Sequence, residues 1–455
     1  MFKRTILIAC AGLALSGCTM MPKYERPAAP VAARYPGATQ TNESRAADTG
    51  WRDFFADERL QKLIGLSLTN NLDLRVAVLN VEQSRAQYRV TRSASLPTVN
   101  AGGSYTRSGD FSTASDSWNA SLGTTSYELD LFGRVRSLNR QALEKYFSTA
   151  EARRDTQITL VAEVATEYFT LRQMEEQLQV ARQTLSAVQE SYGLNKAEFD
   201  AGAIGEMDLR TSEGQVQTAK INVMTYERQL EQTKNYLTLL VGAPLPADLP
   251  PARPFAGTNL VAEIPAGLPS ELVLRRPDIL EAEHKLKAAS ANIGAARAAF
   301  FPTVKLTGSI GTTSSEFEKL FGSGTGVWSF SPQVTVPIFT GGQNRADLDA
   351  AKISKRIEVA NYQKAIQTAF REVSDALVAV ESYRQQITAE DALQKAEQVR
   401  YDLANLRYRQ GEDTYLNVLS AQQDFYSAQQ GLLEAQFNEL SSRISLYKAL
   451  GGGWK

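Results

Sequence analysis

The 455-residue chain is poor in the residues that build metal clusters, disulfide frameworks and acid–base centres. It has one histidine, His284, and two cysteines, Cys10 and Cys18. Two cysteines exclude a disulfide scaffold and most Cys/His metal sites. Histidine-based catalysis would depend on His284 alone. This residue lies beside Glu281 and Glu283 on a predicted helix, where a packing or surface role is the usual one. We expect no metal, no catalytic residues and no enzymatic activity.

The chain also lacks an excess of either charge. It contains 49 Lys and Arg against 50 Asp and Glu, which gives a formal net charge of −1. Binding to nucleic acid through phosphate contacts requires a surplus of basic residues, so nucleic acid is excluded as the main partner. After the N-terminal stretch, no run of about twenty apolar residues occurs that would form a spanning helix. This composition favours a scaffold or a conduit.

The N-terminus has the pattern of an export signal. Lys3 and Arg4 precede an apolar stretch, residues 5–15, that is too short to span a bilayer. We therefore interpret residues 1–17 as a secretory signal peptide. The sequence Leu15-Ser16-Gly17-Cys18 resembles the bacterial lipobox, in which the cysteine becomes the first mature residue and carries the lipid. The alternative is an ordinary signal peptide that happens to contain a cysteine.

Lipid attachment at Cys18 would make residues 18–50 a lipid-anchored extended segment. This segment is rich in Pro, Ala, Thr and Ser, a composition typical of an extended linker. Thr19 follows the cysteine where many lipoproteins retained in the inner membrane have aspartate, so the resemblance directs the chain to the outer membrane. The covalent lipid is the only non-protein group that we expect; no cofactor is indicated.

The body of the chain is an internal repeat. Pro97-Thr98-Val99 matches Pro302-Thr303-Val304 at an offset of 205, and Phe199–Gly202 matches Tyr408–Gly411 at an offset of 209. Val241-Gly242 matches Leu450-Gly451 at that same offset. Landmarks in one order with slowly drifting spacing indicate one structural unit used twice. The predicted repeats are residues 51–242 and 271–455, joined by a Pro-rich linker, residues 243–270.

Each repeat contains a predicted β-hairpin, over residues 97–131 in the first and 302–339 in the second. In the second hairpin, Trp328, Phe330 and the alternate residues after them are apolar, while the intervening residues are mostly polar. This period of two predicts strands with one apolar and one polar face. The alternatives are a small sandwich beneath the helices and a sheet placed between lipid and water.

Most of the remaining sequence has helical periodicity. Apolar residues from Ile366 to Val380 step by four, three, four and three, as in a coiled-coil seam. At 1.5 Å per residue, each of two long helices would measure roughly 100 Å. In each repeat, two shorter helices would stack end to end beside the long one; the alternative is a pair of separate bundles. The expected long helices are 133–199 and 342–409, and the short ones are 72–95, 207–240, 277–299 and 414–449.

The predicted strands bear on oligomeric state. Strands of about ten residues are long enough to cross a bilayer when tilted, but the smallest membrane barrels need about eight strands. An open sheet edge in lipid leaves backbone groups without hydrogen-bond partners. If these four strands enter a membrane, several chains must therefore combine, and three copies would supply twelve strands around a lumen.

Several motifs give the chain a family resemblance. They are Tyr127-Glu128-Leu129-Asp130-Leu131-Phe132-Gly133, Arg275-Arg276-Pro277-Asp278 and the stretch from Ala291 to Pro302. Together with the lipobox, they resemble TolC-like outer-membrane factors, within the NodT/OprM-like lipoprotein branch that serves RND-type multidrug efflux pumps. The resemblance implies an α+β fold in which each internally repeated chain forms one third of a trimeric transmembrane β-barrel, with four strands per protomer, continued by a long periplasmic α-helical barrel.

The same resemblance implies a function and partners. The homotrimer would be a passive exit duct in the outer membrane, conducting drugs and other small molecules from a periplasmic adaptor and an inner-membrane RND pump. Residues 51–70, the linker and the C-terminus would form an equatorial belt. A type I protein-secretion duct shares this fold and remains an alternative. A lipid-anchored periplasmic adaptor is a second alternative, although it should lack so long an internal repeat.

A duct of this kind needs a gate, and the far ends of the helical hairpins are its natural place. We expect Gly202, Gly205 and Gly411 to supply the chain reversals there and to contact the adaptor. The resemblance places acidic residues at two positions that are Asn417 and Ser420 here. Our candidate for the charged aperture is therefore Asp208, with Arg210 as its candidate partner. Leu416 and Leu419 are the apolar alternative, or else ordinary core residues.

Overall fold

The computed structural model describes residues 19–35, 48–253, 255, 261–263 and 274–454. The expected signal peptide and the lipid attachment site at Cys18 lie outside the described residues. The chain separates into two compact units, and each unit contains parts of both sequence repeats. The repeats are therefore not the units of packing. The first unit includes residues 79–151 and 280–365, and the second includes 152–279 and 366–455.

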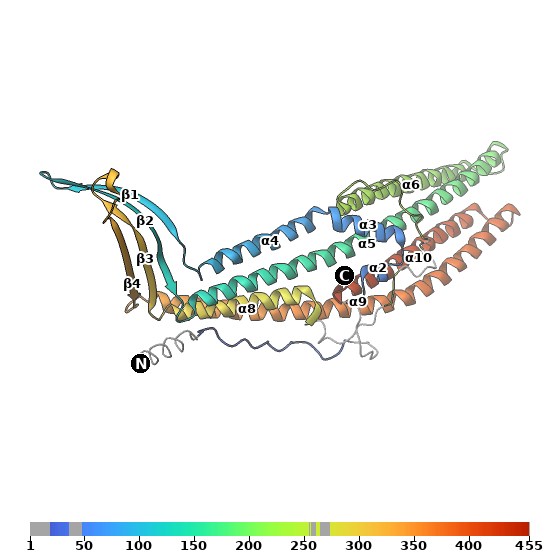
Figure 1. Ribbon diagram of the computed structural model, residues 1–455. Helices are drawn as coiled ribbons and strands as arrows, with labels where there is room; N and C mark the ends of the chain where they lie inside the picture. The colour runs from blue at the N-terminus through green and yellow to red at the C-terminus, as the bar shows by residue number, and fades with distance from the viewer. Residues whose placement is uncertain (1–18, 36–47, 254, 256–260, 264–273, 455) are drawn as a thin grey trace. The chain divides into compact units, whose positions relative to one another are not determined.

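A four-stranded antiparallel sheet lies in the first unit, in the order β1-β2-β3-β4 (Figure 1). The first repeat supplies β1 (Asn100–Gly109) and β2 (Ala114–Leu129), and the second supplies β3 (Thr303–Ser314) and β4 (Gly326–Thr335). Pairing of β2 with β3 joins the two hairpins. Within the described residues, β1 and β4 are the two edges of this sheet.

The strand register separates apolar from polar side chains over most of the sheet below the hairpin tips. Directly opposed residues of antiparallel strands lie on one face. Ile310 is opposite both Leu122 and Trp328, so three strands place apolar side chains on the same face at this level. On the other face, Ser309 is opposite Ser329. The apolar face comprises Tyr105, Trp118, Leu122, Tyr127, Leu129, Val304, Leu306, Ile310, Trp328, Phe330, Pro332 and Val334.

A β-bulge in β2 preserves this separation. The register shifts between Thr124 and Tyr127, and Ser126 adopts a φ of 55°. Without the extra residue, the period of two would turn Tyr127 and Leu129 toward the polar face. The bulge instead places Tyr127 opposite Leu306. The hairpin predicted over residues 97–131 is present, but the period of two did not predict this bulge within it.

The helices follow the periodic segments of the sequence, and each observed end lies within two residues of the expected one. The long helices, α5 and α9, contain 67 residues each, which corresponds to about 100 Å of rise. Among the described residues, none of the helices is both long enough and apolar enough to cross a membrane. The helices are α4 (Leu72–Ser93), α5 (Arg134–Asp200), α6 (Glu206–Val241), α8 (Pro277–Ala298), α9 (Gln343–Arg409) and α10 (Tyr415–Ala449).

In each repeat the end of one short helix meets the beginning of the other, as expected for end-to-end stacking. Asn71, just before α4, donates a hydrogen bond from Nδ2 to the carbonyl of Leu240 near the end of α6. Arg276, just before α8, donates to the carbonyl of Ala449 at the end of α10. Gly242 follows α6 with a φ of 73°, and its missing Cβ would lie 2.7 Å from the carbonyl oxygen of Asn70. The repeated Val-Gly and Leu-Gly motifs thus mark these joints.

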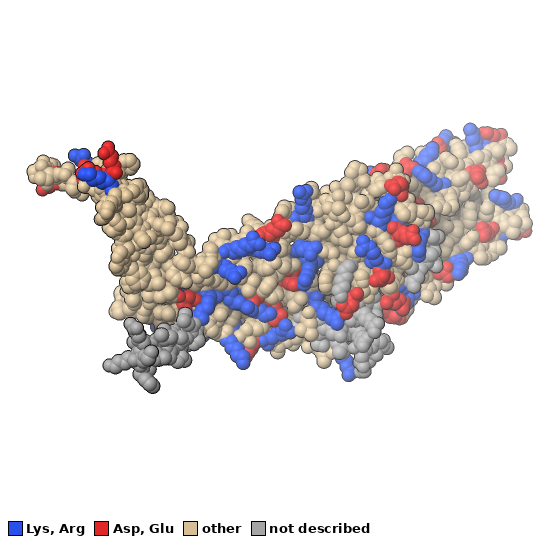
Figure 2. All heavy atoms as spheres, in the orientation of Figure 1, with Lys and Arg blue, Asp and Glu red and all other residues tan. Residues whose placement is uncertain are grey.

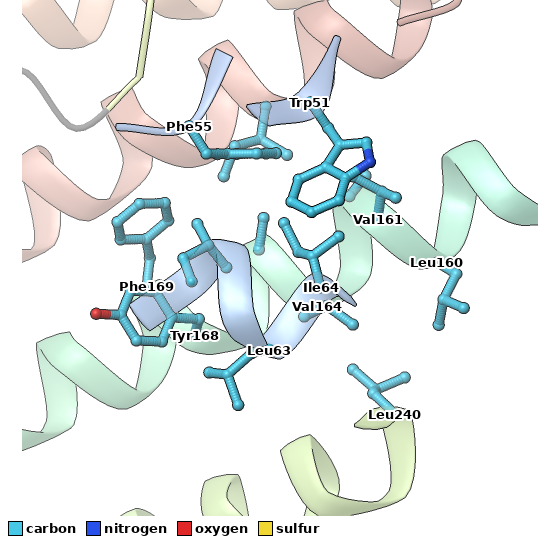
Figure 3. Packing of buried hydrophobic residues seen from close by; sticks show 14 of the residues in the cluster. Trp51, Phe55, Leu63, Ile64, Leu160, Val161, Val164, Tyr168, Phe169 and Leu240 are labelled. Atoms are coloured by element: carbon cyan, nitrogen blue, oxygen red, sulfur yellow. The ribbon is translucent and has the colours of Figure 1, made fainter. Parts of the chain in front are cut away.

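The largest buried cluster lies in the second unit, around the middle of α5. Two short helices, α2 (Trp51–Phe54) and α3 (Glu58–Asn70), pack there, and Figure 3 shows Trp51 and Ile64 directed toward Val161. The ring of Phe54 stacks on Tyr447, with 4.0 Å between centroids. Phe255 and Val261 contribute from the described part of the linker. These are the segments that were expected to form an equatorial belt, and each of them adds buried side chains to this cluster.

Replacing Phe54 with alanine should weaken this cluster. Its side chain is 1 % exposed, and truncation of a buried phenylalanine costs about 3–5 kcal/mol. Hydrogen exchange of α2 and α3 amides should accelerate accordingly. The matched control is Phe111→Ala, because Phe111 is fully exposed at the tip of the first hairpin. Equal exchange in both variants would contradict this account of the core.

Candidate functional site

The candidate site lies at two tight turns, one after α5 and one after α9. Gly202 and Gly411 adopt left-handed φ values of 79° and 74°. Both turns close with the same backbone pattern: the N–H of Gly202 donates to the carbonyl of Phe199, and that of Gly411 donates to the carbonyl of Tyr408. A side chain would be strained at either glycine. Gly205 differs, because its φ of −81° is open to any residue, so it is not needed for the reversal.

The expected pairing of Asp208 with Arg210 is wrong. Arg210 instead pairs with Glu206 at 3.3 Å and Glu213 at 2.9 Å. Residues three or four apart share a helix face, whereas residues two apart do not. Asp208 is consequently left exposed, with no ion pair among the described residues. Burial and Glu198 raise the pKa of Tyr408 most, and the charge of Asp208 adds a smaller contribution in the same direction.

The two candidate leucines at the start of α10, after the second turn, differ in burial. Leu419 is only 8 % exposed and packs within the chain, whereas Leu416 is 68 % exposed. They therefore cannot form one apolar constriction as a pair. Of the two uncharged positions, Asn417 donates from Nδ2 to Asp413, and the Ser420 hydroxyl accepts from Arg400. The hydrogen bond from Asn417 and the N–H of Thr414 help hold the pKa of Asp413 below its usual value.

A hydrogen-bonded link between the ends of α5 and α9 involves residues that the sequence reasoning missed. The hydroxyl of Tyr408 on α9 lies 2.9 Å from Oε2 of Glu198 and 3.1 Å from Oδ1 of Asn195, both on α5. One proton serves both acceptors, and the carboxylate is the stronger. Burial and the hydrogen bond to Glu198 raise the pKa of Tyr408 above its ordinary range, so this donor stays protonated.

The sequence did contain a signal for this link. Tyr408 occupies the position that Phe199 holds in the first repeat. The two residues therefore differ by a hydroxyl at equivalent ends of the two long helices. A hydroxyl that occurs in only one of the two repeats indicates a hydrogen bond that forms in that repeat and has no counterpart in the other.

The single histidine is a packing residue in the structure. His284 on α8 lies with Nδ1 2.6 Å from Oε2 of Glu144 on α5, and its ring packs near Phe147. Glu144 also pairs with Arg140. In the described ranges, no three His, Cys, Asp or Glu side chains are placed to hold a metal ion.

The sheet presents a second candidate surface. On its apolar face, Trp328 is 78 % exposed and Phe330 is 63 % exposed, which is unusual for large apolar side chains. The strands carry no charge along their middle stretches. Charged residues occur only toward the hairpin tips, as with Asp110 and Asp116, and at the base, as with Glu128 and Lys305. Figure 2 shows this uncharged band between two charged ends.

Several helices also expose apolar residues at helical spacing. On α4, Leu72, Val76 and Leu79 follow one another by four and three residues, and all are more than half exposed. On α9, Val399, Leu403 and Leu406 repeat that pattern. Contiguous exposed apolar rows of this kind mark surfaces that another chain covers.

Tyr408→Phe should loosen the turns. It removes the donor to Glu198, and a hydrogen bond to a charged group contributes roughly 1.5–3 kcal/mol. Amide exchange at the ends of α5 and α9 should accelerate about tenfold or more. Tyr415→Phe is the matched control, since its buried hydroxyl has no partner among the described residues. Faster exchange in the control than in Tyr408→Phe would contradict the assignment of this link.

The chain is similar in sequence to known efflux proteins over almost its whole length. The sequence profile described as "Outer membrane efflux protein" matches residues 63–243 and 268–452. The toluene efflux pump outer membrane protein TtgC of Pseudomonas putida is 46 % identical over 468 residues, covering all of this chain and 96 % of that protein. The cation efflux system protein CusC of Escherichia coli is 39 % identical, covering 99 % of each.

A solved structure has the same fold. The open state of the MtrE outer membrane channel of Neisseria gonorrhoeae superposes with a TM-score of 0.91 and 43 % sequence identity. The match covers 96 % of this chain and 99 % of that one. The α+β architecture of a four-stranded sheet with long helices is therefore that of outer membrane channels.

Proposed function

Because the chain belongs to the outer membrane efflux protein family, we propose that it is the outer-membrane exit duct of a tripartite efflux pump. The observation that carries this proposal is the sheet, with one apolar face, one polar face, an uncharged middle and two free edges. Ten-residue strands such as β4 have the length that crosses a bilayer when tilted. The apolar face meets lipid and the face rich in Ser and Thr lines a wet interior.

The sheet edges support a homotrimer. Within the described residues, β1 and β4 each pair with one neighbour only, and an unpaired edge is prohibitive in hydrocarbon. Pairing of β4 with β1 of a second copy removes both edges once the ring closes. Three copies give a twelve-stranded barrel with a lumen. The exposed apolar rows on α4 and α9 are then covered by neighbouring chains, and the helices continue the duct as a periplasmic barrel.

The proposed partners are a periplasmic adaptor and an inner-membrane RND pump, with the glycine turns at Gly202 and Gly411 as the adaptor contact. The proposed anchor is a lipid on Cys18. The relatives are named for toluene and for cation efflux, so one duct fold serves chemically different cargo. The duct itself performs no chemistry: it conducts small molecules passively, and the pump selects them and supplies the energy.

Gating is proposed at the helix turns. Moving α9 away from α5 breaks the bond between Tyr408 and Glu198, so this link holds the turns together at rest. Asp208 lies beside them, exposed and unpaired by any described residue. A threefold axis would assemble three such carboxylates into a ring, and a ring of acidic side chains favours cations.

Mass and conductance of the purified protein test the duct. We expect a trimer in mild detergent and small, mostly closed single-channel currents in planar bilayers. A monomer without conductance would contradict the duct and favour the lipid-anchored adaptor. A conducting trimer that restores secretion of a protein substrate, but not efflux of small molecules, would favour the protein-secretion duct.

Asp208→Asn tests the charged ring. If three Asp208 side chains line the aperture, their neutralisation should lower the preference of the open channel for cations by severalfold, because ring charge sets selectivity. The matched control is Glu206→Gln, since Glu206 is already paired with Arg210. An equal effect of both substitutions would show that general surface charge, and not a ring at Asp208, sets the selectivity.

A further inference from the structure

A partly enclosed cavity of about 470 Å³ lies in the second unit, close to the two glycine turns. Three helices line it, namely the end of α5, the end of α9 and the beginning of α10, so both sequence repeats contribute. Small-molecule sites have volumes of roughly 300–1,000 Å³. One chain supplies this lining, so the cavity does not depend on a second copy.

Two buried side chains of the lining have polar atoms without hydrogen-bond partners among the described residues. Asn195 on α5 is 1 % exposed; its Oδ1 accepts from Tyr408 at 3.1 Å, whereas its Nδ2 has no partner in the described ranges. Tyr415 on α10 is 8 % exposed, and its hydroxyl has none there either. Burial raises the pKa of Tyr415, so this hydroxyl stays protonated and can donate. Because buried polar groups are normally hydrogen-bonded, two such groups at one cavity indicate a polar ligand.

Three tyrosines and the absence of net charge characterise the rest of the described lining. Tyr401 on α9 lines the cavity with Tyr408 and Tyr415, whose ring centroids lie 5.6 Å apart with the planes inclined by 56°. The charged residues of the lining are Glu190 and Arg409, one of each sign, and both are exposed. Since the buried polar groups are neutral as well, an uncharged ligand with an aromatic ring fits this lining best.

We propose that this cavity is a binding site for uncharged aromatic carboxamides. The ligand carbonyl accepts from Nδ2 of Asn195, the amide group pairs with the Tyr415 hydroxyl, and the ring packs among the tyrosines. A carboxylate in place of the amide binds more weakly, because it brings a charge to a site whose buried polar groups are neutral.

Binding at this cavity is coupled to the helix turns. The lining comes from α5 on one side and from α9 and α10 on the other, so a ligand that contacts all three favours the arrangement in which they lie together. That arrangement contains the hydrogen bond from Tyr408 to Glu198. Asn195 keeps Oδ1 for Tyr408 while Nδ2 binds the ligand, so the two contacts are compatible. This consequence rests on the proposed function: in a duct gated at the turns, the ligand holds the gate shut.

The experiment measures equilibrium dialysis of 2-naphthamide against the full-length protein in lipid nanodiscs, with empty nanodiscs as the blank and 2-naphthoate as the charged analogue. Gly193→Leu fills the cavity without removing a polar group, because Gly193 lines it and a Cβ there would meet nothing within 4 Å. The matched control is Gly214→Leu on α6, where a Cβ also meets nothing within 4 Å but the residue lies outside the lining. Both replacements favour the helix over glycine. Tyr415→Phe removes one of the two polar partners.

We expect the parent to bind 2-naphthamide saturably with a dissociation constant of about 1 mM or lower, and 2-naphthoate about tenfold more weakly. Tyr415→Phe should weaken binding about three- to tenfold, and Gly193→Leu about tenfold or more, while Gly214→Leu matches the parent. Absence of saturable binding by the parent would overturn the proposal and leave Asn195 and Tyr415 to water. Equal binding of the two ligands, or equal loss in the two glycine variants, would overturn it as well.

Amide exchange at the ends of α5 and α9 tests the coupling. A ligand that binds only while the helices lie together should slow this exchange by the factor 1 + [L]/Kd in the parent, and much less in Gly193→Leu. Unchanged exchange in the parent at saturating ligand would overturn the coupling. In planar bilayers, 2-naphthamide should lower the open probability of the parent. A parent that binds the ligand but never conducts would instead reject the proposed function and leave the binding site in place.

Discussion

Backbone hydrogen bonding at the edges of the sheet is the constraint on which the rest of this structure depends. The four strands carry one apolar and one polar face, so each chain suits a boundary between lipid and water. The same chain exposes the N–H and C=O groups of two edge strands, for which hydrocarbon has no partner. Membrane insertion and assembly are thus coupled. The apolar rows on α4 and α9 add helical contact surface to what the strands require.

The internal repeat builds this assembly from one plan used twice, yet the two copies have diverged at their ends. Both turns close with a left-handed glycine and the same backbone bonds, and both joints between short helices follow a glycine motif. The side chains there differ. Tyr408 bonds to α5, whereas the equivalent Phe199 has no hydroxyl to offer. A backbone of matching turns therefore carries a different set of polar contacts in each repeat.

The sequence was sufficient for the features that follow from periodicity. The helix ends, the two hairpins and the separation of faces come from steps of three, four and two residues, and the family resemblance and fold class are confirmed. The sequence did not predict features in which a shift of a single residue changes the face on which a side chain lies. The bulge at Ser126 breaks the period locally, and Arg210 pairs three and four residues away, on a face that excludes Asp208. Leu416 and Leu419 were both candidates for an apolar constriction, but packing within the chain buries Leu419 and leaves Leu416 exposed.

The docking of the N-terminal residues Tyr24 and Arg26 on Glu283 of α8 could not be found from the sequence for a different reason. Residues 19–29 have no helical or strand period, and their composition is that of a flexible linker. What orders them is Glu283, which lies 257 residues beyond Arg26. The side-chain pattern of an extended segment does not reveal its conformation when a distant helix supplies its hydrogen-bond partners. Composition predicts that such a segment is flexible in the absence of tertiary contacts. Contacts such as the one with Glu283 determine whether it is held in place.

The strands and the helix turns differ in their content of charged residues. Along the middle of the strands the residues of the polar face are Ser, Thr and other uncharged side chains, which discriminate little between solutes of different charge. At the helix turns, Glu206, Asp208 and Arg210 crowd into one short stretch. In the proposed duct, selection by charge would therefore lie at the turns, where the hydrogen bond from Tyr408 to Glu198 also joins the two long helices. If the proposed gate also selects by charge, the strands need no second filter, and their sequence has only to satisfy lipid on one face, water on the other and pairing at the two edges.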